Sequence, residues 1–164
     1  MRFFVDTEFN GFGGDILSMA IVSERGKTLY LALPEQDIET MNLDPWVERY
    51  VVPVIDVYNA SAKRLPKDAW GFEIQRFLRG AKNITFVADW PEDISHLMNA
   101  MIIAPGGMIN LPSFHVDMQR VDAYAAKPLG AVRHNALWDA RALCQFHTGN
   151  FTDQDAKAET RKSA

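Results

Sequence analysis

Short apolar runs separated by turn-forming residues organise the first part of the chain. Three runs rich in Phe, Val, Ile and Leu occupy residues 2–6, 16–23 and 28–33. A glycine-rich segment, residues 11–14, and a polar segment, residues 24–27, separate them. Such turn chemistry between short apolar runs is typical of β-hairpins. The pattern therefore predicts a three-stranded antiparallel meander.

Helical signals dominate the next part of the chain. Asp44 is suited to cap a helix that has Pro45 at its first position and continues to Val51. A second helix is expected over about residues 67–79, with Gly80 placed to end it. Its predicted buried stripe consists of Trp70, Ile74, Phe77 and Leu78.

A buried strand and a capped helix are expected next. Residues 84–88, Ile-Thr-Phe-Val-Ala, have the composition of a buried strand. A helix is expected over residues 90–103, because Asp89 and Glu92 have capping-box spacing and Pro91 falls in the first turn. This region therefore predicts a strand that leads directly into a helix.

The last third of the chain gives one strong helical signal among weaker ones. We expect a turn at residues 104–107, a strand near 113–117 and a short helix near 118–126. A helix from Asn135 to about His147 is the strongest prediction. The side chains available for one face of this helix are Leu137, Ala140, Leu143, Cys144 and His147. A meander followed by alternating helices and strands predicts an α/β fold, with a mixed five-stranded sheet and helices on both faces.

Length and composition are those of one globular domain. The chain has 164 residues, of which 48% are hydrophobic and 23% charged. We assign residues 1–150 to this domain and residues 151–164 to a polar tail. Cys144 is the single cysteine and has no partner for an intrachain disulfide, which favours the cytoplasm. No apolar run approaches the roughly 18 residues that span a bilayer, so no membrane association is expected.

Net charge limits the mode of binding to nucleic acid but does not exclude it. The formal charge of −4 argues against a protein that binds nucleic acid mainly through a basic face. However, Asp6, Glu8, Asp93 and Asp139 together carry −4, so the remaining charges sum to zero. Bound divalent cations would neutralise those four carboxylates. A phosphate-bearing substrate therefore remains compatible with the composition.

Two acidic residues lie at the end of the first apolar run. Asp6 and Glu8 are two positions apart, so in a strand both carboxylates point to the same side. Adjacent negative charges are unfavourable unless a cation or a proton compensates them. The alternative is a solvated strand end, which fits poorly with the apolar residues on either side. The pair is therefore a candidate metal ligand.

A third candidate ligand follows the strand at residues 84–88. Asp89, Glu92 and Asp93 crowd one turn, where a helix N-terminus favours acidic residues whether or not a metal binds. Asp89 and Glu92 are already assigned to the capping box. Asp93 is therefore the candidate ligand, with Asp89 as the alternative.

His134 and Asp139 form the last candidate pair. Five positions apart, they would point to different faces of one regular helix. They converge only if His134 lies in the loop before the helix and Asn135 caps it. The other histidines are assigned structural roles; they are His96, His115 and His147. An imidazole titrates near neutrality, so His134 is suited to act as a general base beside a metal site.

In combination, these segments resemble the three exonuclease motifs of the DEDDh 3′-to-5′ exonucleases, in the family's order and over nearly the whole chain. The segments are Asp6-Thr7-Glu8, Asp93-Ile94 after a strand, and His134-Asn135-Ala136-Leu137-Trp138-Asp139-Ala140-Arg141-Ala142. This family has the ribonuclease H-like fold and includes proofreading domains, oligoribonuclease and ribonuclease T. The N-terminal sequence and small size are most similar to its stand-alone bacterial and phage exoribonucleases. Asn135 stands where the family's tyrosine variant has its tyrosine, which disfavours that variant.

The resemblance implies a two-metal mechanism that releases nucleoside 5′-monophosphates. Asp6 would bridge two Mg²⁺ or Mn²⁺ ions. Glu8 and Asp139 would serve the ion that holds the attacking water, and Asp93 would act through the shell of the other ion. His134 would accept the proton of the water. The chain departs from many relatives in having Phe9 after the glutamate and Asn135 after the histidine.

Residues next to the motifs are candidates for substrate contact. They are Thr7, Phe9, Asn10, Phe12, Trp90 and Arg133. Aromatic rings can stack on any base, although most aromatic residues are core residues. Arg133, like Arg120 and Lys127, could meet phosphates or belong to a solvated surface. The segment at residues 11–14 lacks the Lys-Ser/Thr of a P-loop.

The expected partner is nucleic acid with a free 3′ end, and RNA is favoured over DNA on resemblance alone. The choice between single and double strands stays open. The resemblance is also compatible with a homodimer. Two alternatives remain: a ribonuclease H-like endonuclease, which would not need His134, and a nucleic-acid-binding module with an inactive site.

Overall fold

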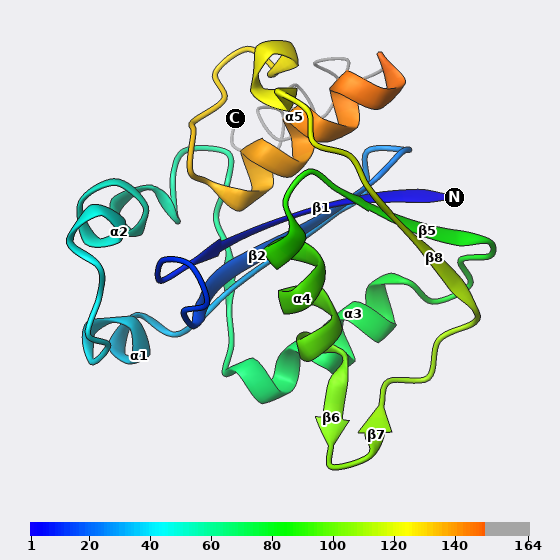
Figure 1. The fold of residues 1–164 in the computed structure, drawn as a ribbon, viewed down its shortest axis with the longest axis horizontal. Helices are drawn as coiled ribbons and strands as arrows, with labels where there is room; N and C mark the ends of the chain where they lie inside the picture. Colours follow the sequence, from blue (N-terminus) through cyan, green and yellow to red (C-terminus); the bar gives the residue numbers. More distant parts are fainter. Residues whose placement is uncertain (150–164) are drawn as a thin grey trace, which may run out of the picture.

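A mixed six-stranded sheet forms the centre of the protein (Figure 1). The computed structural model describes residues 1–149, so the predicted tail lies outside the described residues. The strand order is β4-β3-β2-β1-β5-β8. The strands are β1 (Arg2–Phe9), β2 (Ile16–Ser23), β3 (Thr28–Ala32), β4 (Lys63–Arg64), β5 (Ile84–Ala88) and β8 (Phe114–Met118).

Strand directions bring several strand ends to one edge of the sheet. β2 pairs antiparallel with both β1 and β3, whereas β5 pairs parallel with β1 and with β8. The carboxyl ends of β1, β5 and β8 therefore meet at the same edge. In open α/β sheets this edge is where ligands bind.

The predicted meander and the two later strands are confirmed, but the predicted count of five strands is wrong. The sixth strand is β4, which has only two residues and pairs with the edge of β3. A separate two-stranded hairpin joins β6 (Ile102–Ala104) and β7 (Gly107–Met108). The helix predicted to reach residue 103 therefore ends earlier, at Ala100, because the following apolar residues pair as a strand.

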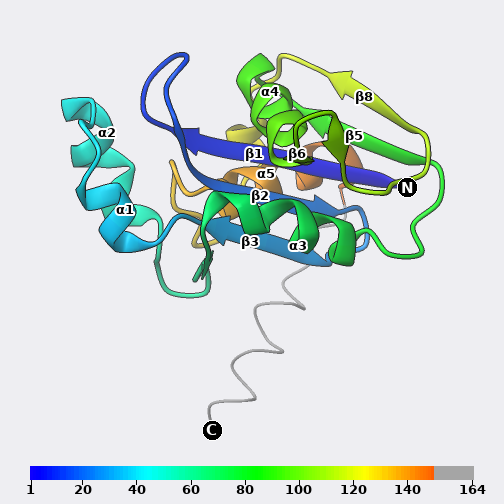
Figure 2. The same cartoon turned by 90° about the horizontal axis from the view of Figure 1, so that it is seen from below.

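Helices cover both faces of the sheet (Figure 2). On one face, α3 (Trp70–Phe77) and α4 (Pro91–Ala100) pack in a core that includes Phe3 and Val5 of β1. On the other face, α5 (Ala136–Thr148) packs in a core that includes Phe4. The alternation of side chains along β1 thus supplies both cores.

Two further helices lie at the end of the sheet where β1 ends (Figure 1). They are α1 (Glu35–Glu39), which the sequence did not predict, and α2 (Pro45–Tyr50). The predicted cap of α2 is confirmed, because the Asp44 carboxylate accepts a hydrogen bond from the Trp46 backbone N–H at 2.8 Å. Three short 3₁₀ turns complete the described residues: η1 (Val52–Val54), η2 (Lys67–Ala69) and η3 (Ala123–Ala126).

Two predicted helices need correction, and a third is confirmed. The helix expected over 67–79 consists of η2 followed by α3, and its predicted stripe is buried. The short helix expected near 118–126 is reduced to η3, because β8 extends to Met118. The helix expected from Asn135 is confirmed as α5, and the side-chain oxygen of Asn135 caps it by accepting from the Trp138 N–H at 3.1 Å.

The capping box predicted for α4 is wrong. No side chain caps α4, and the residue at its N-cap position is Trp90. The Glu92 carboxylate instead accepts hydrogen bonds from the Gly13 backbone N–H at 2.6 Å and from the Trp90 indole N–H at 3.1 Å. The Glu92 carboxylate, which local spacing assigned to the cap, thus accepts from a donor 79 positions away in the sequence.

No helix within residues 1–149 has the length and apolar character that crossing a membrane requires.

Candidate metal centre

Acidic side chains from distant parts of the sequence meet where β1 and β5 end. Asp6 and Glu8 share one side of β1, as their two-residue spacing predicted, and by the alternation of the strand this is the side of Phe4, which α5 covers. Asp89 follows β5 directly, and Asp93 lies in the first turn of α4. Asp139 lies in the first turn of α5. These side chains, together with His134, form two groups whose ligand atoms lie close together.

The first group consists of Asp6, Asp89 and Asp93, whose carboxylate oxygens lie within 4.8 Å of one another. Thr7 positions Asp93: its backbone N–H and its hydroxyl donate to Asp93 Oδ1 at 2.9 and 2.7 Å. Asp6 Oδ2 and Asp93 Oδ2 are buried and accept no hydrogen bond from the described residues. Because both Asp89 and Asp93 belong to the group, the choice between them as the motif ligand stays open.

The second group consists of Glu8, His134 and Asp139, again with ligand atoms within 4.8 Å of one another. His134 lies in the loop before α5, the condition under which its convergence with Asp139 was expected. Its backbone has a φ of 63°, and its N–H donates to Asp139 Oδ2 at 3.0 Å. Asp139 Oδ1 is buried without a hydrogen bond from the described residues.

Burial raises the pKa of every carboxyl group in the two groups. At Asp6, burial is the largest cause, the carboxylates of Asp93 and Asp139 add to it, and the pKa lies well above its usual range. Burial likewise raises the pKa of Glu8 well above its usual range. It raises the pKa of Asp89, and it raises the pKa of Asp93 and of Asp139 to about 7. These carboxylates are therefore costly to ionise together unless a cation neutralises them.

The pKa of the His134 imidazole is shifted in the opposite direction. Burial, followed by the nearby charge of Arg133, lowers its pKa below the usual value for histidine. The neutral imidazole is therefore favoured near neutral pH. A neutral imidazole can accept a proton, which a general base requires.

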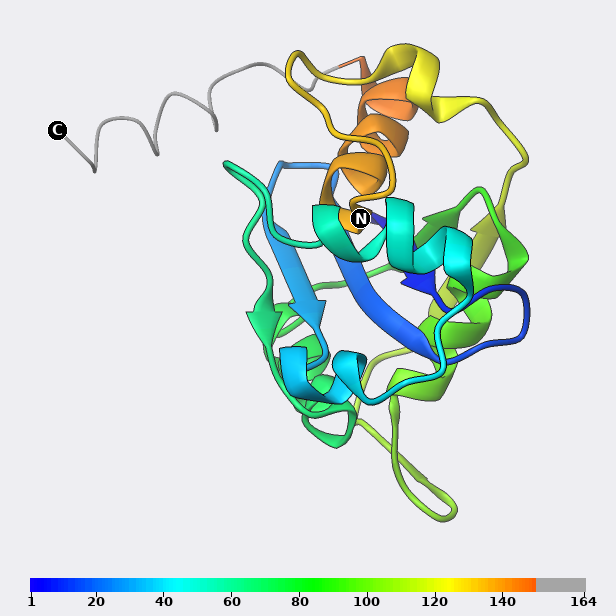
Figure 3. The ribbon, with the colours of Figure 1, turned by 90° about the vertical axis from the view of Figure 1, so that its left-hand side faces the viewer.

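A cavity of about 770 Å³ opens over the acidic residues. Aromatic rings form much of its wall; they belong to Phe9, Phe12, Trp46, Trp90 and Tyr124. Figure 3 faces this end of the sheet and shows α2 lying across it, next to α5. Among the candidates from the sequence, Phe9, Phe12, Trp90, Arg133 and Thr7 line the cavity.

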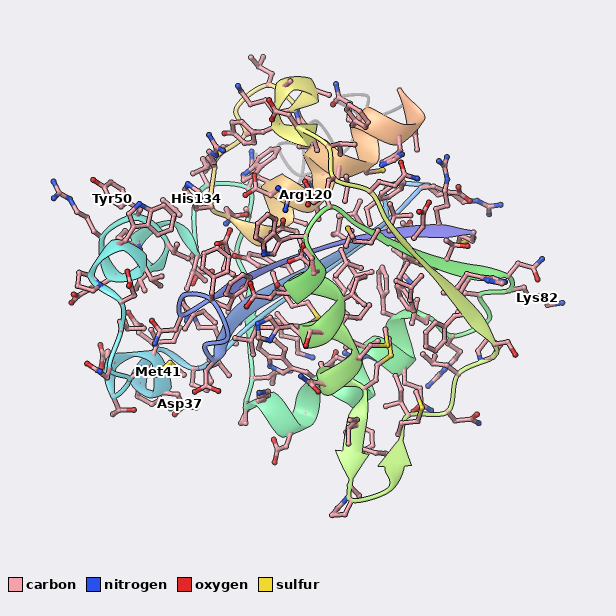
Figure 4. The ribbon with its side chains drawn as sticks, viewed as in Figure 1. Asp37, Met41, Tyr50, Lys82, Arg120 and His134 are labelled. Carbon is pink, nitrogen blue, oxygen red and sulfur yellow. The ribbon has the colours of Figure 1, made fainter. Side chains whose placement is uncertain are left out.

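Trp46 of α2 is a cavity residue that sequence reasoning missed. Its ring lies edge-on to the His134 imidazole, with 4.9 Å between ring centroids and an interplanar angle of 83°. Figure 4 labels His134 and Tyr50, the last residue of α2, at the same end of the molecule. The capping signal at Asp44 and Pro45 indicated this helix, but no local signal indicated which side chain it would bring to His134.

Two of the predicted substrate contacts have structural partners. Thr7 is buried, and its hydroxyl is already bonded to Asp93. The Asn10 side chain donates to the Asn42 carbonyl at 2.9 Å and accepts from the Asp44 N–H at 2.7 Å. Asn10 thereby fastens the segment before α2 to the end of β1, and it does not line the cavity. A contact of either residue with substrate stays a prediction.

The three cations that the sequence offered to phosphates each lie over an aromatic ring. Arg120 lies over Trp90 at 3.9 Å from its centroid. Lys127 and Arg133 lie over Tyr124 at 4.5 and 5.4 Å. Phe12, which is 82% exposed at the tip of the β1–β2 turn, has its centroid 5.8 Å from that of Trp90.

The remaining histidines lie outside both groups. His96 contacts the ring of Phe9, and His147 stacks on Phe4. His115 lies on the edge strand β8.

In comparisons with known proteins, the chain matches no family model and no curated protein.

Proposed function

We propose that this protein is a metal-dependent 3′-to-5′ exonuclease, acting on RNA in preference to DNA. The observation that supports this proposal is the convergence of two ligand groups at the end of β1. One is Asp6, Asp89 and Asp93, and the other is Glu8, His134 and Asp139. An imidazole beside clustered carboxylates is a donor set suited to metal-assisted hydrolysis of a phosphodiester.

The residues fit hard divalent cations. Carboxylate oxygens are the ligands that Mg²⁺ and Mn²⁺ prefer. Asp6 Oδ2, Asp93 Oδ2 and Asp139 Oδ1 are buried acceptors without donors among residues 1–149, which a cation would satisfy. Two ions, when bound, would polarise the phosphate, activate water and stabilise the leaving oxygen.

The chain's own residues have distinct parts in the proposed reaction. Asp6 and Glu8 would hold cations from one strand, because they contribute to different groups. Asp93 and Asp139 would complete the two halves. His134 would accept a proton on its imidazole, which is neutral near pH 7 because burial lowers its pKa.

The cavity suits the end of an unpaired strand. Rings of Trp46, Trp90 and Phe12 would stack on bases, which is independent of sequence because every base has a π face. Arg133, which also lines the cavity, would contact a phosphate. The preference for RNA rests on the resemblance alone.

The sheet is compatible with the ribonuclease H-like fold that the resemblance implies. Without the edge strand β4, the order β3-β2-β1-β5-β8 contains the five predicted strands, and helices cover both faces. We infer that β4 is an addition at the edge of this arrangement.

The test is hydrolysis of labelled single-stranded RNA and DNA, linear and circular, with Mn²⁺ or with EDTA. We expect stepwise release of mononucleotides from linear strands, dependence on the metal, and loss of activity in Asp139→Ala. Cleavage of circular strands would instead indicate an endonuclease. Binding of metal and nucleic acid without any hydrolysis would indicate a binding module and overturn the proposal.

A further inference from the structure

A buried polar network lies directly behind His134. Asn135 is 0% exposed, and its side-chain N–H groups point to three oxygens. They lie 2.8 Å from the Val54 carbonyl, 2.9 Å from the Ile55 carbonyl and 3.2 Å from the Tyr30 hydroxyl. The Tyr30 hydroxyl in turn donates to the Ile55 carbonyl at 2.6 Å. This network therefore joins β3, the segment after α2 and the start of α5.

The network lies between elements that surround His134. On one side, Asn135 caps α5 and directly follows His134, whose backbone N–H holds Asp139. On the other side, Val54 and Ile55 follow α2, which carries Trp46 against the His134 imidazole. The side-chain amide of Asn135 thus hydrogen-bonds the start of α5 directly to the segment that follows α2.

No side chain within residues 1–149 forms a hydrogen bond with the His134 imidazole. The ring packs edge-on against Trp46, and a ring nitrogen lies within 4.8 Å of carboxylate oxygens of Glu8 and Asp139. General bases are commonly oriented by a third polar group. Here the orientation must come from the backbone before α5 and from packing against Trp46.

We propose that Asn135 and Tyr30, acting as a pair, are positioning residues that fix His134 and Trp46 relative to the acidic groups. The proposal rests on the proposed function, because it assigns the pair a purpose in proton transfer by His134. It also gives a reason why an amide suits this position. A Lys or Arg side chain there could donate to the carbonyls but could not also accept the hydrogen bond that the Trp138 N–H donates.

Two variants separate the parts of the network. Asn135→Ser keeps an oxygen that can cap α5 but removes the donors to Val54 and Ile55. Tyr30→Phe removes a single hydroxyl and leaves the cap intact. Ile74→Val, in α3 on the opposite face of the sheet, is the control for a small loss of core packing.

Steady-state hydrolysis is measured for each variant with and without His134→Ala. We expect Asn135→Ser to lower kcat about 10- to 100-fold, with KM and metal affinity changed less than about threefold, because misplacement of a reacting group is costly. Tyr30→Phe should lower kcat about threefold. In the His134→Ala background both effects should fall below about twofold, because interacting sites are not additive. Equal losses in both backgrounds would overturn the proposal.

A second measurement does not depend on hydrolysis. The Cε1–Hε1 NMR signal of His134 should shift or broaden in Asn135→Ser and Tyr30→Phe and stay unchanged in Ile74→Val. If the wild type does not hydrolyse nucleic acid, the proposed function fails, and this signal alone decides whether the pair positions His134. An unchanged signal in both variants refutes the positioning. If Asn135→Ser does not fold, Tyr30→Phe decides.

Discussion

The two helices that bring an aspartate to the site hold it in different ways. Asp139 in the first turn of α5 accepts a hydrogen bond from the backbone N–H of His134, five positions away. Asp93 in the first turn of α4 accepts hydrogen bonds from the backbone and the hydroxyl of Thr7, 86 positions away. α5 has a side-chain cap, whereas α4 has none. Asp139 is thus held by a local hydrogen bond, whereas Asp93 is held by hydrogen bonds from a residue of β1.

The largest expected effect comes from Asp139, the locally held aspartate. Asp139→Asn should lower hydrolysis at least about 1000-fold, because it leaves its group with a single carboxylate, and the charge stabilisation that a metal supplies is worth several kcal/mol. Asp93→Asn should cost less, because two carboxylates, Asp6 and Asp89, remain in its group. Initial rates at saturating Mn²⁺ compare the two. The exposed Asp37 provides the control, Asp37→Asn, which should match the wild type.

Stability of the metal-free protein should depend on pH in both halves. Burial raises the pKa of Asp93 and Asp139 to about 7, from an ordinary value of 3.8. The folded state therefore holds these protons more tightly than the unfolded chain does. The resulting stabilisation is complete below about pH 3.8 and is lost as the pH rises through about 7.

We expect the Tm measured in EDTA to be on the order of 5 °C lower at about pH 8 than at about pH 5, because this stabilisation is lost. Mn²⁺ should recover the loss at the higher pH, because it binds the ionised carboxylates. Asp139→Asn and Asp93→Asn should each flatten the dependence, and Asp37→Asn should not. A steeper dependence in either site variant would contradict the assignment of the proton to that carboxyl.

A smaller effect should come from the hydrogen bond by which Thr7 of β1 holds Asp93. Thr7→Val removes the hydroxyl that donates to Asp93 while keeping the size of the side chain. We expect metal affinity to fall about tenfold, as is usual when a group that orients a ligand is removed. Isothermal titration with Mn²⁺ measures the change. Thr7→Ser keeps the hydroxyl and should bind as the wild type does, and equal weakening by both variants would exclude this hydrogen bond as the cause.

The smallest effect is expected where Glu92 holds the β1–β2 turn. Glu92→Ala removes the acceptor of the Gly13 and Trp90 hydrogen bonds and so releases Phe12 from its place near Trp90. We expect KM for single-stranded RNA to rise about three- to fivefold, because a typical hydrogen bond contributes about 1 kcal/mol. Metal affinity should not change. Glu92→Gln keeps one acceptor oxygen, so its KM should lie between the values for the wild type and Glu92→Ala. A fall in metal affinity in either variant would contradict this separation of roles.

Sequence reasoning succeeded where a signal is local. The cap of α2 at Asp44, the cap of α5 at Asn135 and the apolar runs of β1, β2 and β3 all depend on neighbours in the chain. It also gave the condition under which His134 and Asp139 could meet. Each of these features follows from short-range periodicity or from a side chain bonding its own backbone.

It failed where a distant partner changed the outcome. Glu92 has the spacing of a capping residue, but its carboxylate accepts a hydrogen bond from the Gly13 N–H instead. The two residues of β4 carry no alternating apolar pattern, so only the edge of β3 defines them as a strand. Trp46 contacts His134 from a helix whose preceding segment Asn10 fastens to the end of β1, a contact that spans more than 30 positions. Spacing along the chain carries no information about such partners.

A single strand of eight residues contributes to both ligand groups, Asp6 to one and Glu8 to the other. β1 is hydrogen-bonded on both sides, so it cannot shift against one neighbour alone. A slip of one residue would turn both carboxylates to the opposite side of the sheet at once. Damage to this strand would therefore take carboxylates from both groups at once, whereas damage to either helix would leave the other group with all of its members.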